Sequence, residues 1–256
     1  MKINRIALFL ASALFLATSC DEDEKDTDPK PIAQTCSLTK ATEGQQITNL
    51  TYSADKLASF TAGSQTATIV YNPAGKPSKL TYSGSSNEVV YTYDTQGKLT
   101  SMSVSEAAEG GVRMLSTQYE YTNNQITKAT NSVYFRPSSG PSTIPMPRGY
   151  TTYNYDAKGN ITVVKEYNAQ NSLVSTTEKS DYDDKVNPGS LLHSLFGPAS
   201  PNNPRTEVKK DAAGNVDKAA SFTNVYTYNA SGYPSKVEKT NQNGVKSVTV
   251  FDYSCK

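Results

Sequence analysis

Residue types that build catalytic and metal sites are scarce in this chain. Its 256 residues include no tryptophan, three cysteines and one histidine, His193. One histidine cannot supply a His-x-x-x-His zinc pair, and no Cys-x-x-Cys pair is present. We interpret His193 as an incidental helix-surface residue, not as a catalytic or metal-binding group. We therefore expect no metal and no cofactor.

An excess of charge of either sign is also missing. The formal net charge is +1, from 25 basic and 24 acidic residues. Such a chain lacks the basic surface that attracts nucleic acid. We expect no nucleic-acid partner.

Motifs for catalysis are absent too. There is no Gly-x-Ser-x-Gly turn for a nucleophilic serine and no glycine-rich phosphate loop. Asp183 and Asp184 could form the carboxylate pair of a glycoside hydrolase, but neighbouring strand residues point to opposite faces of a sheet. We interpret them as a turn and capping device and predict that the protein is not an enzyme. An accessory enzyme of envelope glycan handling is the alternative.

The aromatic composition indicates a sheet that is covered on one face. Hydrophobic residues make up 36% of the chain, and tyrosine (17) outnumbers phenylalanine (7). Tyrosine tolerates a half-wet position because its ring packs while its hydroxyl reaches water. A thick core on both faces of the sheet is not expected from this composition.

A tight hairpin around residues 91–99 is the clearest structural motif. Asp94 suits the first position of a type I turn, and Gly97 suits the position that needs a positive φ. This register places Tyr93 opposite Leu99 and Thr92 opposite Thr100.

The same plan recurs along the chain. Six segments place a tyrosine opposite an aliphatic residue or a proline: Tyr52/Leu57, Tyr71/Pro77, Tyr93/Leu99, Tyr121/Ile126, Tyr155/Ile161 and Tyr228/Pro234. The remaining predicted turn residues are Gly75, Asp156, Gly159 and Gly232. The copies at 52–57 and 121–126 have loops one residue shorter, which fit two-residue type I′ turns. A seventh, degenerate copy has Gly214 in the turn and Lys210 in place of the tyrosine.

The pattern Tyr-Asp-x-x-Gly-(Lys/Asn)-(Leu/Ile) resembles the YD repeat of RHS-type proteins. The small number of repeats and the N-terminal leader are similar to those of YD-repeat-like lipoproteins of unknown function in Gram-negative anaerobes. The resemblance covers residues 47–253 and implies an architecture, but almost nothing about activity. A structural RHS-like shell element is a further alternative, although seven repeats are too few to enclose a cargo domain.

We predict an all-β domain over residues 36–256. It is a single long antiparallel meander of repeated hairpins with about 12–16 strands, twisted and curled toward an open barrel or clam. An insert at 183–205 is predicted to hold one short helix, which contains Leu191, Leu192, Leu195 and Phe196 and docks on the tyrosine face. Residues 136–149 are rich in proline and are predicted to be an extended excursion, not a central strand.

Two of the cysteines lie near the ends of this domain. In an oxidising compartment, Cys36 and Cys255 could form a disulfide. A flat meander would hold them tens of ångströms apart, whereas the bond needs Cα atoms within about 7 Å. Either the sheet curls until its ends meet, or the N-terminal segment crosses over, or the bond does not form. We favour curling.

The N-terminus resembles a lipoprotein leader. Lys2 and Arg5 precede an apolar run that is too short to span a bilayer, and small residues precede Cys20. We predict a signal peptide at 1–19 and acylation of Cys20, which would anchor the protein in the outer membrane. The alternative is an ordinary secretory signal with a chance cysteine.

Residues 20–35 begin with an acidic run that cannot pack, so we predict a disordered tether. The run also resembles a surface-export signal, which would place the protein on the cell surface. A calcium site is the alternative, but the EF-hand spacing is absent.

Together these features predict a non-enzymatic, monomeric envelope lipoprotein that acts as a binding or scaffold module. Its ligand would be a glycan or a peptide on an exposed sheet face or edge. Tyr-x-Tyr pairs such as Tyr91/Tyr93 could stack on sugars, although cross-strand packing accounts for them more simply.

Overall fold

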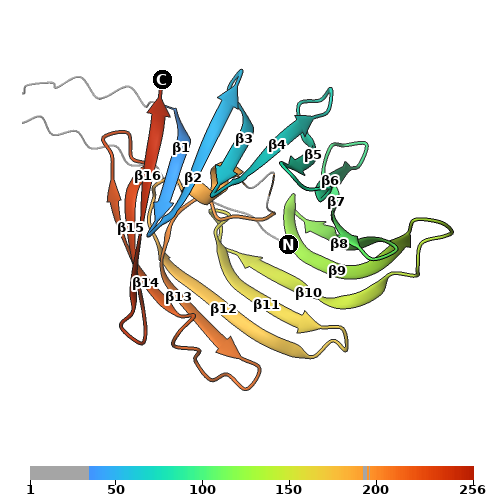
Figure 1. The fold of residues 1–256 in the computed structure, drawn as a ribbon. Helices are drawn as coiled ribbons and strands as arrows, with labels where there is room; N and C mark the ends of the chain where they lie inside the picture. The colour runs from blue at the N-terminus through green and yellow to red at the C-terminus, as the bar shows by residue number, and fades with distance from the viewer. Residues whose placement is uncertain (1–34, 193–194, 196) are drawn as a thin grey trace, which may run out of the picture. The chain divides into compact units, whose positions relative to one another are not determined.

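The computed structural model describes residues 35–192, 195 and 197–256. Residues 34–256 form one compact unit, in which the described residues build a closed antiparallel barrel of 16 strands (Figure 1). The signal peptide (1–19), Cys20 and nearly all of the tether (20–35) lie outside the described residues, as do His193 and Phe196.

Each strand pairs with its neighbours in sequence, and β1 pairs with β16 to close the ring. The strands are β1 (Cys36–Glu43), β2 (Gln46–Ser53), β3 (Lys56–Ala62), β4 (Gln65–Tyr71), β5 (Pro77–Tyr82), β6 (Glu88–Tyr93), β7 (Leu99–Ala108), β8 (Gly111–Thr122), β9 (Gln125–Pro137), β10 (Met146–Tyr155), β11 (Ile161–Asn168), β12 (Leu173–Tyr182), β13 (Pro204–Asp211), β14 (Phe222–Tyr228), β15 (Pro234–Asn241) and β16 (Lys246–Cys255). The predicted all-β meander is confirmed, but the barrel is closed and not an open clam.

The tyrosine-centred hairpins pair in the predicted register. The facing residues are Tyr52/Leu57, Tyr71/Pro77, Tyr93/Leu99, Tyr121/Ile126, Tyr155/Ile161 and Tyr228/Pro234. Each hairpin also has a bulge beside its tyrosine. Thr92 pairs with Ser101 and not with Thr100, so the prediction for Thr92 is wrong. A bulge increases local twist and bends the strand, and its recurrence in each hairpin helps the sheet to curl.

The turns use the predicted chemistry. The Asp94 carboxylate accepts hydrogen bonds from the N–H groups of Gln96 (2.9 Å) and Lys98 (2.8 Å). Gly97 has φ 77°, which a side chain would strain. In the shorter turn of β8–β9, Asn123 (φ 49°) and Asn124 (φ 64°) are both left-handed, as a type I′ turn requires.

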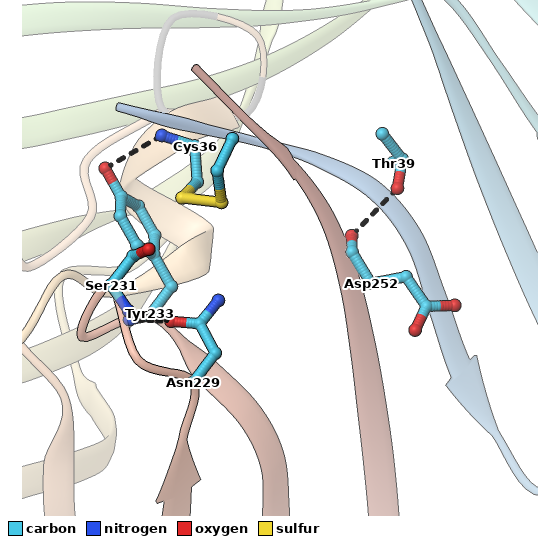
Figure 2. The surroundings of a disulfide bond; sticks show 7 residues. Cys36, Thr39, Asn229, Ser231, Tyr233 and Asp252 are labelled. Atoms are coloured by element: carbon cyan, nitrogen blue, oxygen red, sulfur yellow. Dashed lines mark hydrogen bonds between the residues drawn. A yellow bond between two sulfur atoms is a disulfide. The ribbon is translucent and has the colours of Figure 1, made fainter. Parts of the chain in front are cut away.

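The disulfide between Cys36 and Cys255 is present at the seam of the barrel (Figure 2). These residues pair directly between β1 and β16, with their Cα atoms 4.0 Å apart. The Cys36 N–H donates to the Tyr233 hydroxyl (3.3 Å), and Thr39 Oγ1 donates to the Asp252 carbonyl (3.0 Å). Curling of the sheet is therefore the means by which the chain ends meet.

The insert between β12 and β13 differs from its predicted form. Its described residues hold a 3₁₀ helix, η1 (Pro188–Leu192), in place of the predicted α-helix. The Ser190 N–H donates to the Asn187 carbonyl (2.9 Å), a three-residue spacing that suits a helix too short to gain α-helical cooperativity. Leu192 and Leu195 still pack on the apolar core inside the barrel, as predicted for the docked insert.

The proline-rich excursion is shorter than predicted. The connection between β9 and β10 spans residues 138–145, while Met146 and Pro147 belong to β10 and pair with Val133 and Ser132. A bulge follows Pro147, and a bulge is one of the few places where a strand accepts proline.

We expect the disulfide to stabilise the closed form. Replacing both cysteines (Cys36→Ser with Cys255→Ser) frees the two ends of the chain in the unfolded state and should lower the free energy of unfolding by roughly 2–5 kcal/mol. Denaturant unfolding of the two proteins measures this difference.

The bond itself is checked by mass spectrometry after alkylation without a reducing agent. Alkylation of either cysteine in the folded wild-type protein would contradict the seam described above.

Candidate functional site

A row of five tyrosine hydroxyls links successive hairpins in the described chain. Each of the five donates to the carbonyl of the residue that faces the preceding tyrosine, as in Tyr93 to Pro77 (2.7 Å) and Tyr121 to Leu99 (2.9 Å). The other members are Tyr71 to Leu57 (2.7 Å), Tyr155 to Ile126 (2.6 Å) and Tyr182 to Ile161 (2.5 Å). Burial raises the pKa of Tyr155 to about 12, and the nearby Tyr153 and Tyr121 hydroxyls add smaller increases.

Lysines cover the same row. Lys76 lies 5.5 Å from the centre of the Tyr93 ring and donates to the Gly97 carbonyl of the next turn. Lys56 over Tyr71 (5.3 Å) and Lys98 over Tyr121 (5.6 Å) repeat the arrangement. A cation over a tyrosine ring is an attractive contact. In these hairpins the tyrosine is therefore bound to the preceding hairpin twice, by its hydroxyl and by the lysine over its ring.

The degenerate seventh copy does not belong to this row. Successive connections of an antiparallel meander alternate between the two rims of the barrel, and the turn at Gly214 joins β13 to β14 at the rim opposite the tyrosine hairpins. Its turn chemistry is intact, because Asp211 Oδ1 accepts from the Ala213 and Asn215 N–H groups (both 2.9 Å). Lys210 also pairs with Val216 across the turn, so the segment keeps the register of a degenerate copy but lies at the opposite rim.

The Tyr-x-Tyr pairs do not offer the sugar-stacking surface on an exposed sheet face that the sequence suggested. Tyr91 is only 5% exposed, and its hydroxyl donates to the Leu195 carbonyl (3.1 Å) of the insert. Tyr52, Tyr71 and Tyr93 pack around the same core. The Tyr-x-Tyr pairs therefore line the inside of the barrel.

Polar side chains hold the insert inside the barrel. Asp183 Oδ1 accepts from the N–H groups of Lys185 (3.0 Å) and Asn203 (3.1 Å), and its Oδ2 accepts from the Tyr228 hydroxyl. Asp184 instead pairs with Lys185 at 3.2 Å and is exposed. The two carboxylates thus lie in different surroundings, in keeping with the predicted turn and capping device.

A cavity of about 400 Å³ remains between the insert and the barrel wall. Its apolar side is formed by Leu38, Leu50, Phe60, Leu192, Val237 and Phe251, and Ala41 also lines it. Its polar side is formed by Asn203, Tyr226 and Lys239. We take this lumenal cavity as the candidate functional site, since small-molecule sites typically combine an apolar lining with a few polar groups.

Two buried acceptors on the polar side have no partner. Asn203 is 1% exposed and lines the cavity, and its Oδ1 receives no hydrogen bond. Asn224, which is 2% exposed, pairs across strands with the cavity residue Lys239, and its Oδ1 is also unpaired. A buried acceptor without a donor costs about 1–3 kcal/mol, so these atoms favour a partner.

Charged side chains lie beside these amides. Glu207 pairs with Lys179 at 3.0 Å and accepts from Asn224 Nδ2 (3.2 Å). Burial by itself would raise the pKa of Glu207, but Lys179, Lys239 and Asn224 outweigh it and hold the pKa below its ordinary value. Glu207 is therefore ionised near neutral pH, and two lysines share its one negative charge.

The predicted repeat residues are absent from the lining of this cavity. They border a second cavity of about 320 Å³ at the tyrosine rim, where Tyr93, Gly97 and Leu99 meet Pro198 of the insert. Sequence reasoning missed Asn203, Asn224 and Lys239. The alternation Phe222-x-Asn224-x-Tyr226 was the available signal, because it places one polar side chain among inward-facing aromatics.

The described residues contain neither a group of metal-binding side chains nor a membrane-spanning helix. No three His, Cys, Asp or Glu side chains in the described ranges are grouped so that they could hold a metal ion. Nor does the described part of the chain contain a helix long and apolar enough to cross a membrane.

No protein-family model matches the chain, and no curated protein matches it. Among solved structures, it is similar to a porin-like protein from Bacteroides vulgatus, with a TM-score of 0.53 and 15% identity over 85% of this chain and 98% of that one. A porin-like protein from Bacteroides uniformis gives a TM-score of 0.35 and 11% identity over 85% and 98%. A structure of the Photorhabdus luminescens Tc holotoxin pore gives 0.25 and 16% over 80% of this chain and 9% of the other.

The first likeness shows a shared barrel fold. The other two have TM-scores too low to carry an argument.

We expect the tyrosine row to contribute to stability through its hydroxyls. Tyr93→Phe keeps the ring but leaves the Pro77 carbonyl without its donor, and should lower the free energy of unfolding by about 1 kcal/mol. Tyr134→Phe is the matched control, since the structure gives its hydroxyl no hydrogen bond, and should cost less than about 0.5 kcal/mol. Equal losses in the two variants, measured by denaturant unfolding, would show that the hydroxyl contact adds nothing.

Proposed function

We propose that this protein is a non-enzymatic envelope lipoprotein, anchored in the outer membrane through acylated Cys20, whose barrel binds a small ligand in the lumenal cavity. The protein acts as a monomer. The leader at 1–19 and the acidic tether at 20–35 support the location, and the YD-like hairpins support kinship with the YD-repeat-like lipoproteins. The cavity supports the binding activity.

The outer wall of the barrel supports anchoring by lipid and not by the strands. Charged pairs such as Lys128–Glu120 (2.9 Å) and Lys210–Glu178 (2.8 Å) lie on it. A barrel that spans a bilayer instead presents an apolar outer band about 25 Å tall with aromatic girdles, and lysine near its middle is costly. The buried apolar cluster of this chain lies inside the barrel, where a spanning barrel is typically polar.

The closed seam changes where a ligand can bind. Every strand has two partners in the ring, so the sheet has no wholly unpaired strand, although β13 and β14 share only the pairs Thr206–Thr223 and Glu207–Phe222. The tyrosine faces point inward, so the predicted glycan or peptide site on an exposed face or edge is replaced by a site in the lumen.

One observation carries the binding proposal: the cavity has an apolar lining and an unpaired buried acceptor, Asn203 Oδ1. A packed structural core would fill such a space and pair such an atom. In a ligand-binding site, the space is filled and the acceptor is paired only when the ligand binds.

The proposal is tested by filling the cavity. Ala41 faces the lumen on β1, and Ala41→Phe should abolish binding of the apolar fluorophore N-phenyl-1-naphthylamine to the exported full-length chain carrying Cys20→Ser. That substitution removes the predicted acylation site. Because cleavage of the leader depends on the same cysteine, residues 1–19 are also replaced by an ordinary secretory signal, which avoids the need for detergent. The control is Ile47→Phe, which adds an aromatic ring on the outer wall at a side chain that is 43% exposed.

The fluorescence increase on titration measures binding, and circular dichroism confirms that each variant is folded. Equal binding by the two folded variants, or none by the parent chain, would refute a lumenal site.

A further inference from the structure

We propose that the ligand of the lumenal cavity is a small amphipathic carboxylate that also carries a hydrogen-bond donor near its charged end, such as a hydroxy acid or an amido acid with an aliphatic body. This inference rests on the proposed function and specifies the chemistry of its ligand. It follows from three features of the cavity: an apolar side, an excess of positive charge and unpaired acceptors.

The apolar side sets the body of the ligand. Leu38, Leu50, Phe60 and Phe251 come from β1, β2, β3 and β16, and none of them has a polar atom in its side chain. Each buried CH₂ group of a ligand gains about 0.8 kcal/mol against such a surface. The volume of about 400 Å³ lies within the ~300–1,000 Å³ range of small-molecule sites. An aliphatic chain therefore suits this side better than a sugar.

The charge balance on the other side favours an anion. Lys239 lines the cavity, and its charge and that of Lys179 act on the single carboxylate of Glu207. Asp183 also acts on Tyr226 of this side, and Arg205, which acts on the neighbouring Tyr228, offsets its negative charge. Lys179 and Glu207 form an ion pair. Lys239 contacts the Phe222 ring (5.8 Å to its centre) and, among these described cations, is the lysine without an ion pair.

The unpaired acceptors add a requirement that a simple carboxylate cannot meet. Asn203 Nδ2 donates to both carboxylate oxygens of Asp183 (3.2 Å each) and to the carbonyls of Lys185 (3.2 Å) and Val186 (3.3 Å). Four acceptors around one atom fix the orientation of the amide, since the reverse placement would set its oxygen against a carboxylate. The Oδ1 of this cavity residue is therefore an acceptor that needs a donor, which a carboxylate lacks.

A ligand with a hydroxyl or an amide N–H beside its carboxylate satisfies both demands. The carboxylate pairs with Lys239, and the donor pairs with Asn203 Oδ1. An alkyl alcohol would leave Lys239 unpaired, and an alkylamine would bring a second positive charge to it. The polar end thus selects among molecules with the same aliphatic body.

The test uses four probes with a ten-carbon chain: 3-hydroxydecanoate, decanoate, decanol and decylamine. Isothermal titration calorimetry with the full-length Cys20→Ser chain should give the order 3-hydroxydecanoate, decanoate, decanol, decylamine, from tightest to weakest. A charge-assisted contact of this kind corresponds to about tenfold in affinity. We expect about that factor between decanoate and decanol.

Lys239→Gln should weaken binding of both acids about tenfold and leave decanol unchanged. Lys236→Gln is the matched control on the same strand, because Lys236 pairs with Glu238 on the outer wall and should leave all four affinities unchanged. The comparison of 3-hydroxydecanoate with decanoate tests the donor without altering Asn203, which also holds the insert.

The outcomes separate the two proposals. Equal affinities for the four probes, or the tightest binding by decylamine, would overturn the ligand class while leaving a lumenal binding site. Failure of all four probes together with the fluorophore would overturn the site itself. Loss of acid binding in Lys236→Gln but not in Lys239→Gln would place the charge contact on the outer wall and contradict the inference.

Discussion

The barrel depends on the hydrogen bond by which a tyrosine hydroxyl donates to a carbonyl of the preceding hairpin. This contact recurs at Tyr71, Tyr93, Tyr121, Tyr155 and Tyr182. It joins residues far apart in sequence, as Tyr155 and Ile126 show at 2.6 Å, and it fixes the ring against the inner wall. Because the hydroxyl is satisfied there, the chain can use tyrosine as an interior residue without leaving an unpaired polar group. A wall that contains many tyrosines encloses a lumen that is mainly apolar but still includes hydrogen-bonding atoms.

Closure and the candidate site follow from that wall. The recurrent bulges curl the meander until β1 meets β16, and the Cys36–Cys255 bond holds the seam. A ring of sixteen strands is too wide for its own side chains to fill, so the insert occupies part of the lumen and is held by Asp183 and Asn203. The cavity is the space that the insert leaves between the apolar side chains of β1, β2, β3 and β16 and the polar residues Asn203, Tyr226 and Lys239.

Local chemistry could be predicted from the sequence, whereas long-range geometry could be predicted only where the two cysteines imply a contact between the ends of the sheet. The Asp94–Gly97 turn and the Tyr93–Leu99 pair follow from φ preferences and strand alternation within ten residues. Tyr167 and Leu173 form another such pair, which was missed because Asn171 takes the left-handed position of the glycine. Closure depends on the pairing of Cys36 with Cys255, about which the local pattern says nothing. The site was missed because its polar residues, Asn203, Asn224 and Lys239, converge from the insert and two strands.

The central claim is that the tyrosine hydroxyls donate to carbonyls inside a closed lumen. The most direct test of this claim is the ionisation of these tyrosines. The rings can be labelled with ¹³C and followed by NMR as the pH is raised, with single Tyr→Phe variants for assignment. Burial holds the pKa of Tyr155 and of Tyr182 at about 12, against an ordinary value of 10.0, so both should stay protonated well above pH 10. The stability that they contribute is fully present below pH 10 and is lost as the pH rises toward 12. Reversible ionisation of either tyrosine at its ordinary pKa in the folded protein would contradict the account.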